Sequence, residues 1–324
     1  MSDAFDRLVA SIPALGVDWH RETILANSRA NVPHIKRTLR DVSLRGADVI
    51  VVSAGPSLYK RNMLARIAAL DAREQIIVAI DGSYVQCLRA GIAPHYVLTL
   101  DPHPTRIVRW FGDPDFAANS AGDDYFARQD LDEAFRAGAE RQNAENIVLV
   151  DDHAAESCIV ICSTAAANVV ARTAAFARYW FAPLVDNPHV PGRLARQIAE
   201  ITGLPALNTG GTVGTAAIMF AHQVLKARRI AVVGMDLGYA ADMPLERTQS
   251  WNMLKGRPDV ADLYPRVQHP QWGECYTDPT YRWYAQNLLA LLKAGDFTIT
   301  NCTEGGALYG TRVECMRLEE WARG

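Results

Sequence analysis

Residues 48–57 read DVIVVSAGPS, and this stretch decides the fold class. Its first part is a continuous apolar run, which is typical of strands that a parallel sheet buries on both faces. The run stops at a Ser-Ala-Gly-Pro-Ser turn, and residues 64–70 then have the pattern of a helix. The stretch therefore predicts one strand–turn–helix unit of an α/β fold.

The same pattern recurs along the chain. Helices separate further predicted strands at about 75–80, 96–100, 146–150, 229–233 and 297–301. Strands that alternate with helices indicate a doubly wound, mainly parallel sheet with helices on both faces. We expect a Rossmann-like domain over residues 46–324, preceded by a small helical segment at residues 1–45.

Composition excludes several classes of protein. The 324 residues include 33 Lys and Arg against 36 Asp and Glu, and 49% are hydrophobic, so the chain is neither disordered nor a general nucleic-acid binder. No stretch approaches the ~20 uninterrupted apolar residues of a membrane span. The start of the chain lacks a secretory signal, and the six cysteines form no CxxC pair. We therefore expect a cytoplasmic protein with free thiols.

Small or acidic residues follow several of the predicted strands. Ser53–Ser57 ends the first strand, Asp81 the second and Asp101 the third, while Asp236 and Tyr239 follow the strand at 229–233. In open parallel sheets, ligands bind outside the carboxyl ends of the strands. Because these ends share one edge of a sheet, they predict a polar crevice there.

Two of the turns suit an anion. In the first, Ser53, Gly55 and Ser57 let main-chain N–H groups approach a ligand, although Ser57 can equally cap a helix. In the second, residues 208–215 (NTGGTVGT) open a helix, whose N-terminus attracts negative charge. The alternative for this loop is tight packing of the helix on the sheet. It is not a Walker A loop, because no Gly-Lys-Ser/Thr follows.

Three strand-end side chains leave alternatives open. Asp101 can bind Mg²⁺ together with substrate phosphates, bind a sugar hydroxyl, or form an Asx-turn before Pro102. Asp236 can cap the next helix or face the crevice. The phenol of Tyr239 can serve as an acid or stabilise an anion.

Six motifs along residues 45–320 together carry a family resemblance. They are VIVVSAGPSLYK at 49–60, IVAIDGS at 77–83, GIAPHYVLTLD at 91–101, NTGGTVGTAA at 208–217, IAVVGMDLGY at 230–239 and NCTEGGALYG at 301–310. In order and spacing they resemble the Maf-type (motility-associated factor) glycosyltransferase domain. That domain belongs to the superfamily named after archaeal 6-hydroxymethylpterin diphosphokinase (MptE-like), and it is similar to bacterial sialyltransferases.

The resemblance implies a sialyltransferase-like fold and a set of site residues. The nucleotide would be lined by Gly55, Pro56 and Ser57. The phosphate or sugar of the donor would contact Asn208, Gly210, Gly211 and Thr212. Asp236 and Tyr239 would lie at the edge of this site, and Glu304 would close it with the two glycines that follow.

Three functions follow as hypotheses. The first is transfer of a CMP-activated nonulosonic acid to a glycan or protein acceptor, without a metal or other cofactor, with catalytic candidates Asp101, Asp236, Tyr239 and Glu304. The second is pyrophosphoryl transfer from ATP to a pterin-like alcohol, with Asp81 and Asp101 holding Mg²⁺. The third is a nucleotide-sugar-binding protein without catalysis. The sequence leaves homo-oligomerisation open.

Overall fold

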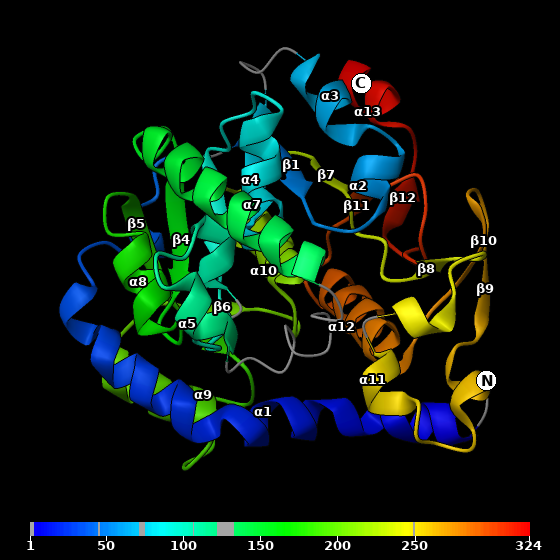
Figure 1. Ribbon diagram of the computed structural model, residues 1–324, viewed down its shortest axis with the longest axis horizontal. Coiled ribbons are helices and arrows are strands. Elements are labelled where there is room, and N and C mark those ends of the chain that lie inside the picture. Colours follow the sequence, from blue (N-terminus) through cyan, green and yellow to red (C-terminus); the bar gives the residue numbers. More distant parts are fainter. Residues whose placement is uncertain (1–2, 45, 71–74, 106, 122–132, 249) are drawn as a thin grey trace. The chain divides into compact units, whose positions relative to one another are not determined.

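The computed structural model describes residues 3–44, 46–70, 75–105, 107–121, 133–248 and 250–324 (Figure 1). The chain divides into two compact units. The first unit comprises Met1–His20, Arg45–Gln75 and Thr209–Gly324, and the second comprises Arg21–Leu44 and Ile76–Asn208. The N-terminal helix α1 (Asp3–Asn31) begins in the first unit and ends in the second.

The first unit contains four parallel strands in the order β12-β11-β7-β1. They are β1 (Asp48–Val52), β7 (Ile230–Val233), β11 (Ile299–Asn301) and β12 (Val313–Cys315). Every residue of β1 and β7 is buried, as their continuous apolar runs predict. Helix α10 (Val213–Gln223) packs on both strands and is apolar nearly all round, which is typical of a buried helix.

The remaining helices of this unit are α2 (Ser57–Lys60), α3 (Met63–Ala68), α11 (Trp251–Leu254), α12 (Pro279–Ala294) and α13 (Leu318–Arg323). Two 3₁₀ turns, η4 (Leu245–Arg247) and η5 (Val260–Leu263), accompany them.

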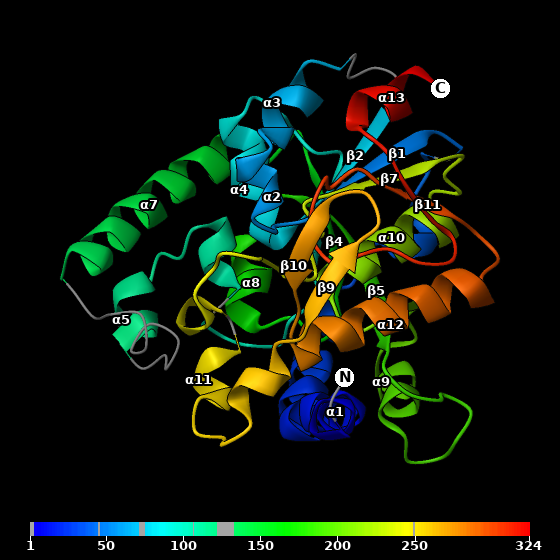
Figure 2. The ribbon, with the colours of Figure 1, turned by 90° about the vertical axis from the view of Figure 1, so that its right-hand side faces the viewer.

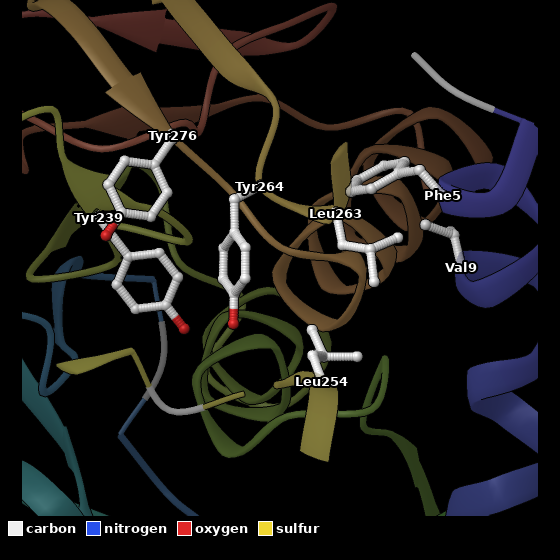
Figure 3. Packing of buried hydrophobic residues seen from close by; sticks show 7 residues of the cluster. All are labelled: Phe5, Val9, Tyr239, Leu254, Leu263, Tyr264 and Tyr276. Atoms are coloured by element: carbon white, nitrogen blue, oxygen red, sulfur yellow. The ribbon is translucent and has the colours of Figure 1, made fainter. Parts of the chain in front are cut away.

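A small antiparallel sheet completes the first unit. Its strands are β8 (Tyr239–Ala240), β10 (Gly273–Tyr276) and β9 (Arg266–His269), in that order, and Figure 2 shows the β9–β10 hairpin. The sheet region shares a hydrophobic cluster with the start of α1 (Figure 3). The cluster consists of Phe5, Val9, Tyr239, Leu254, Leu263, Tyr264 and Tyr276.

The second unit contains five parallel strands in sequence order. They are β2 (Gln75–Ile80), β3 (Tyr96–Thr99), β4 (Cys158–Cys162), β5 (Ala177–Leu184) and β6 (Ala206–Asn208). The helices are α4 (Asp81–Arg89), α5 (Phe116–Ala121), α7 (Glu133–Asp152), α8 (Ala167–Arg172) and α9 (Leu194–Thr202). Short 3₁₀ turns are η1 (Val32–His34), η2 (Leu39–Asp41) and η3 (Val108–Phe111).

The predicted α/β class with parallel strands is confirmed. Five of the six predicted strands are present, but the strand predicted at 146–150 is wrong, because these residues lie inside helix α7. Val148 is 60% exposed while Val150 is buried, so the apolar run NIVLV lies on two sides of a helix rather than in a sheet. A short apolar run does not by itself distinguish a strand from a buried helical turn.

The sequence interpretation missed the parallel strands β4, β5, β6 and β12 and the antiparallel strands β8, β9 and β10. Two of these are only three residues long, and β5 contains arginine and proline, which obscure its pattern. All six cysteines are free thiols, as predicted. In the part of the chain that the structure describes, no helix has both the length and the hydropathy that a membrane crossing requires. The division into residues 1–45 and 46–324 stays a prediction.

Candidate functional site

The turn Ser53–Ser57 joins β1 to α2 and is bound closely to the segment after β7. The Ser53 amide donates to the Val233 carbonyl at 2.9 Å, and the Gly55 amide donates to the Gly234 carbonyl at 2.7 Å. A Cβ on Gly55 would lie 2.1 Å from the Asp236 carboxylate. Glycine is therefore required here, because any side chain would displace Asp236.

Asp236 is a buried carboxylate with a fixed orientation. It is 8% exposed, and its Oδ2 accepts hydrogen bonds from the Ser57 hydroxyl at 2.7 Å and the Ser57 amide at 3.3 Å. Burial raises the pKa of Asp236, and the hydrogen bonds from Ser57 oppose that rise. The sequence left open whether Ser57 caps a helix. Pro56 is the N-cap residue of α2, and the Ser57 hydroxyl binds Asp236 instead.

A cavity of about 140 Å³ lies beside Asp236 in the first unit. Four segments form its walls: Pro56–Arg61, Asp236–Ala241, the hairpin residues Trp272–Cys275, and Glu304–Gly306. Two cationic side chains, Lys60 and Arg61, are exposed at the first wall. The cavity therefore combines a buried acid with cations that attract an anionic ligand.

Glu304 lines the cavity but is held by an ion-pair network. Its side chain is 12% exposed and accepts a hydrogen bond from Arg66 at 2.5 Å, and Arg66 also binds Glu319 of α13 at 2.5 Å. The hydrogen bond from Arg66 lowers the pKa of Glu319 to about 2. Glu304 has a left-handed backbone, with φ +57°. Arg66 could not be found from the sequence, because its partners are more than 200 residues away. The catalytic role of Glu304 stays a prediction.

Tyr239 contributes its ring to the cavity wall, but its hydroxyl donates to Asp278 at 2.7 Å. Asp278 is 1% exposed and also accepts from the Ser250 hydroxyl at 2.7 Å and the Tyr281 amide at 2.8 Å. Burial raises the pKa of Tyr239 above its ordinary value. An acid–base role for Tyr239 would therefore require its hydroxyl to break the hydrogen bond that it donates to Asp278. The role stays a prediction.

Asp278 and Ser250 were missed by the sequence interpretation. Asp278 is the N-cap of α12 and is followed by Pro279 at the first helical position. An Asp-Pro pair before an apolar periodic segment signals such a start. The pair could have marked Asp278 as a helix cap, although not as a partner of Tyr239.

The Gly-rich loop opens α10, as the sequence predicts. Thr212 is the N-cap, and its Oγ1 accepts the amides of Gly214 at 3.0 Å and Thr215 at 3.3 Å. Gly211 has φ +88°, and a Cβ there would lie 2.3 Å from the Trp283 ring. Gly211 is thus packed closely against α12, and the anion role of the loop stays a prediction.

Two buried hydroxyls lie beside this helix N-terminus. Ser53 is 5% exposed and Thr215 is 0% exposed, and neither side-chain oxygen has a hydrogen-bond partner among the described residues. A Cβ placed on Gly214 would lie 3.0 Å from Ser53 Oγ, so the end of β1 touches the first turn of α10. An unpaired buried hydroxyl costs about 1–3 kcal/mol. A ligand that accepts hydrogen bonds here would recover that cost.

The other predicted site residues belong to the second unit. Asp81 begins α4, is 5% exposed and accepts the Gly82 amide at 2.7 Å. Asp101 follows β3 and accepts the His103 amide at 2.7 Å, which is the Asx-turn alternative. Burial raises the pKa of Asp81 to about 7, and the negative charge of Asp101 contributes to this rise. Asn208 is the last residue of β6.

Replacing Asp81 by asparagine is expected to stabilise the protein at neutral and higher pH. Because the folded-state pKa is raised, the contribution of Asp81 to stability is fully present below about pH 4 and is lost as the pH rises to about 7. A shift of roughly three pKa units corresponds to about 4 kcal/mol, which the variant should gain at about pH 8. Urea unfolding of both proteins between about pH 4 and pH 8 measures this difference. A difference that does not change with pH would contradict the prediction.

Comparisons with known proteins agree with this fold. Residues 22–115, which include the Ser53–Ser57 turn, Asp81 and Asp101, match the family model described as 6-hydroxymethylpterin diphosphokinase MptE-like. No curated protein matches the chain. The fold is similar to that of the Maf glycosyltransferase from Magnetospirillum magneticum AMB-1, with a TM-score of 0.56 and 14% identity.

The match covers 91% of this chain and 38% of the Maf chain, so the protein spans well under half the length of that enzyme. The resemblance to Maf-type and MptE-like proteins is thus confirmed, with the Maf similarity established for the fold. At 14% identity, this similarity concerns the fold and not the reaction.

Proposed function

We propose that the first unit binds a nucleotide-activated sugar and transfers the sugar to an acceptor hydroxyl. One observation carries the proposal. The five-residue turn Ser53–Ser57 bears an unpartnered buried hydroxyl against the N-terminus of α10 and, four residues later, the hydroxyl that orients the buried Asp236. The N-terminus of α10, which we propose to bind the phosphate, and a carboxylate of raised pKa thus both contact one short turn. The similarity to a Maf glycosyltransferase supports the same class of reaction.

The helix end suits the phosphate of the donor. The N-terminus of α10 carries a partial positive charge, and Ser53 and Thr215 can each donate a hydrogen bond there. A leaving nucleoside monophosphate gains negative charge as its bond to the sugar breaks. Donors that are already oriented toward this charge stabilise the transition state.

Asp236 suits the role of general base. In the proposed reaction, the acceptor hydroxyl gives its proton to the Asp236 carboxylate and its oxygen bonds to the anomeric carbon. The bond from that carbon to the phosphate oxygen breaks, and its electron pair leaves with the nucleotide. A base works best when its pKa lies near the working pH, and burial moves Asp236 in that direction.

The donor that we propose is a CMP-linked nonulosonic acid. The carboxylate of such a sugar would find Lys60 and Arg61 at the cavity wall. CMP carries one phosphate, and one helix end with two hydroxyls can accommodate that charge without a metal. The acceptor is a hydroxyl of a glycan or protein.

A second function has a specific observation in its favour. The family match at residues 22–115 includes Asp81 and Asp101, two carboxylates that lie close enough to interact electrostatically. Mg²⁺ is commonly bound by one or two carboxylates together with substrate phosphates, so these residues fit such an ion. They would hold Mg²⁺, which would neutralise phosphate charge in a pyrophosphoryl transfer from ATP. Among the described residues, no group of three or more potential metal ligands gathers.

Thermal unfolding with two ligands separates the two functions. CMP in the presence of EDTA should raise the Tm, because a ligand that binds only the folded state stabilises it. At a concentration one hundred times Kd, the gain is about 2.7 kcal/mol, or roughly 5 °C for a chain of this size. Stabilisation by ATP with Mg²⁺ but not by CMP would favour the diphosphokinase. CMP-sugar binding without turnover would favour a binding protein.

A further inference from the structure

The hairpin β9–β10 supplies one wall of the cavity through its tip. Strand β9 ends at His269, strand β10 begins at Gly273, and these two residues are paired in the sheet. Trp272 and the first residues of β10 line the cavity. The position of Trp272 therefore depends on how the tip is held.

His269 holds the tip through its side chain. Its Nδ1 accepts the amides of Gln271 and Trp272, each at 3.1 Å. The His269 and Trp272 rings are stacked, with centroids 6.1 Å apart. Because Nδ1 accepts two hydrogen bonds, it carries no proton, and the neutral imidazole must carry its proton on Nε2.

The second ring nitrogen lies near the segment that follows the Glu304–Gly306 wall. His269 Nε2 lies 3.3 Å from the Leu308 carbonyl and 3.8 Å from Cys315 Sγ. The Leu308 carbonyl also accepts from the Asn301 side chain at 2.8 Å, and Leu308 closes the loop that begins with Glu304. His269 is 1% exposed, so both sets of hydrogen bonds are shielded from water.

We propose that His269 is a positioning residue that fixes the hairpin tip, and with it Trp272, against the loop of Glu304–Leu308. Both ring nitrogens lie within hydrogen-bond distance of main-chain groups, so the imidazole can link the tip to this loop. Burial lowers the pKa of His269, which agrees with a neutral ring. The effect on sugar binding rests on the proposed function, whereas the effect on Trp272 does not.

Two substitutions separate the two ends of the ring. His269→Asn keeps an acceptor near the position of Nδ1, and His269→Gln keeps a donor near the position of Nε2. We expect His269→Gln to reduce the hydrogen-exchange protection of the Gln271 and Trp272 amides by at least about tenfold, corresponding to one lost hydrogen bond. His269→Asn should retain most of it, and the exposed His189→Gln serves as the control.

Equal protection in the two variants, whether lost or retained, would overturn the proposal. The nitrogen chemical shifts of the His269 ring in the wild type provide a test that needs no variant. We expect the tautomer with the proton on Nε2, and a proton on Nδ1 would contradict the assignment.

Affinity for a CMP-linked nonulosonic acid then tests the functional consequence. It should fall further in His269→Gln than in His269→Asn, which keeps the acceptor for the tip and loses only the donor to Leu308. A loss of the same size in both variants, with the amide protections differing as expected, would overturn the positioning role. If the wild type does not bind the CMP-sugar, the proposed function fails. The hydrogen-exchange protection of the two amides still tests whether His269 holds the tip.

Discussion

Asp236→Asn is expected to slow sugar transfer by about 10²–10⁴-fold, which is the usual contribution of a general base. Asparagine keeps an oxygen for the Ser57 hydrogen bonds, so the turn and the bound CMP should be preserved. Release of CMP from a CMP-linked nonulosonic acid in the presence of an acceptor measures the rate. Asp242→Asn, an exposed neighbour in the sequence, serves as the control.

The pH dependence gives the same prediction a second readout. Because burial raises the pKa of Asp236, the wild-type rate should increase with pH along a limb that lies above the ordinary carboxyl value of about 3.9. The variant should lack this limb. An unchanged rate in the variant would exclude Asp236 as the base. A loss of CMP affinity as large as the loss in rate would instead assign Asp236 to ligand binding.

Gly211→Val should lower the free energy of unfolding by about 2–5 kcal/mol and remove CMP binding. The left-handed backbone at φ +88° disfavours a β-branched residue, and the new Cβ would overlap the Trp283 ring at 2.3 Å. The loop would then shift away from the N-terminus of α10. Urea unfolding and calorimetric titration with CMP measure the two effects.

Gly256→Val is the matched control for Gly211→Val, because a Cβ at Gly256 has no atom within 4 Å. Adding Trp283→Leu to Gly211→Val should restore part of the stability by removing the overlapping ring. Equal stability of the two glycine variants would show that the loop adapts without cost.

The sequence predicted those parts of the site that depend on local patterns. The turn Ser53–Ser57 and the loop 208–215 follow from an apolar run that stops and from glycines that open a helix. Asp236 was predicted as a candidate because it comes three residues after a buried strand. These signals lie within about ten residues of the side chain concerned, so no tertiary information was needed.

The partners of these residues could not be predicted, because they come from distant parts of the chain. Arg66 binds Glu304 and Glu319, and Tyr239 binds Asp278. Tyr239 also belongs to the hydrophobic cluster that includes Phe5 of α1. The strand prediction for the apolar run at residues 146–150, which lie in α7, was wrong for a related reason. Whether such a run becomes a strand or a helical turn depends on what it packs against.

The phosphate position in the proposed site can be tested with two ligands and one double variant. Ser53→Ala combined with Thr215→Val removes both unpartnered hydroxyls, and it should stabilise the ligand-free protein, since two unsatisfied buried groups disappear. Calorimetric titration in EDTA compares CMP with cytidine, which lacks the phosphate. We expect the double variant to lose CMP affinity by about tenfold or more while its cytidine affinity stays unchanged. Unchanged CMP affinity, or an equal loss for both ligands, would contradict the placement of the phosphate at the N-terminus of α10.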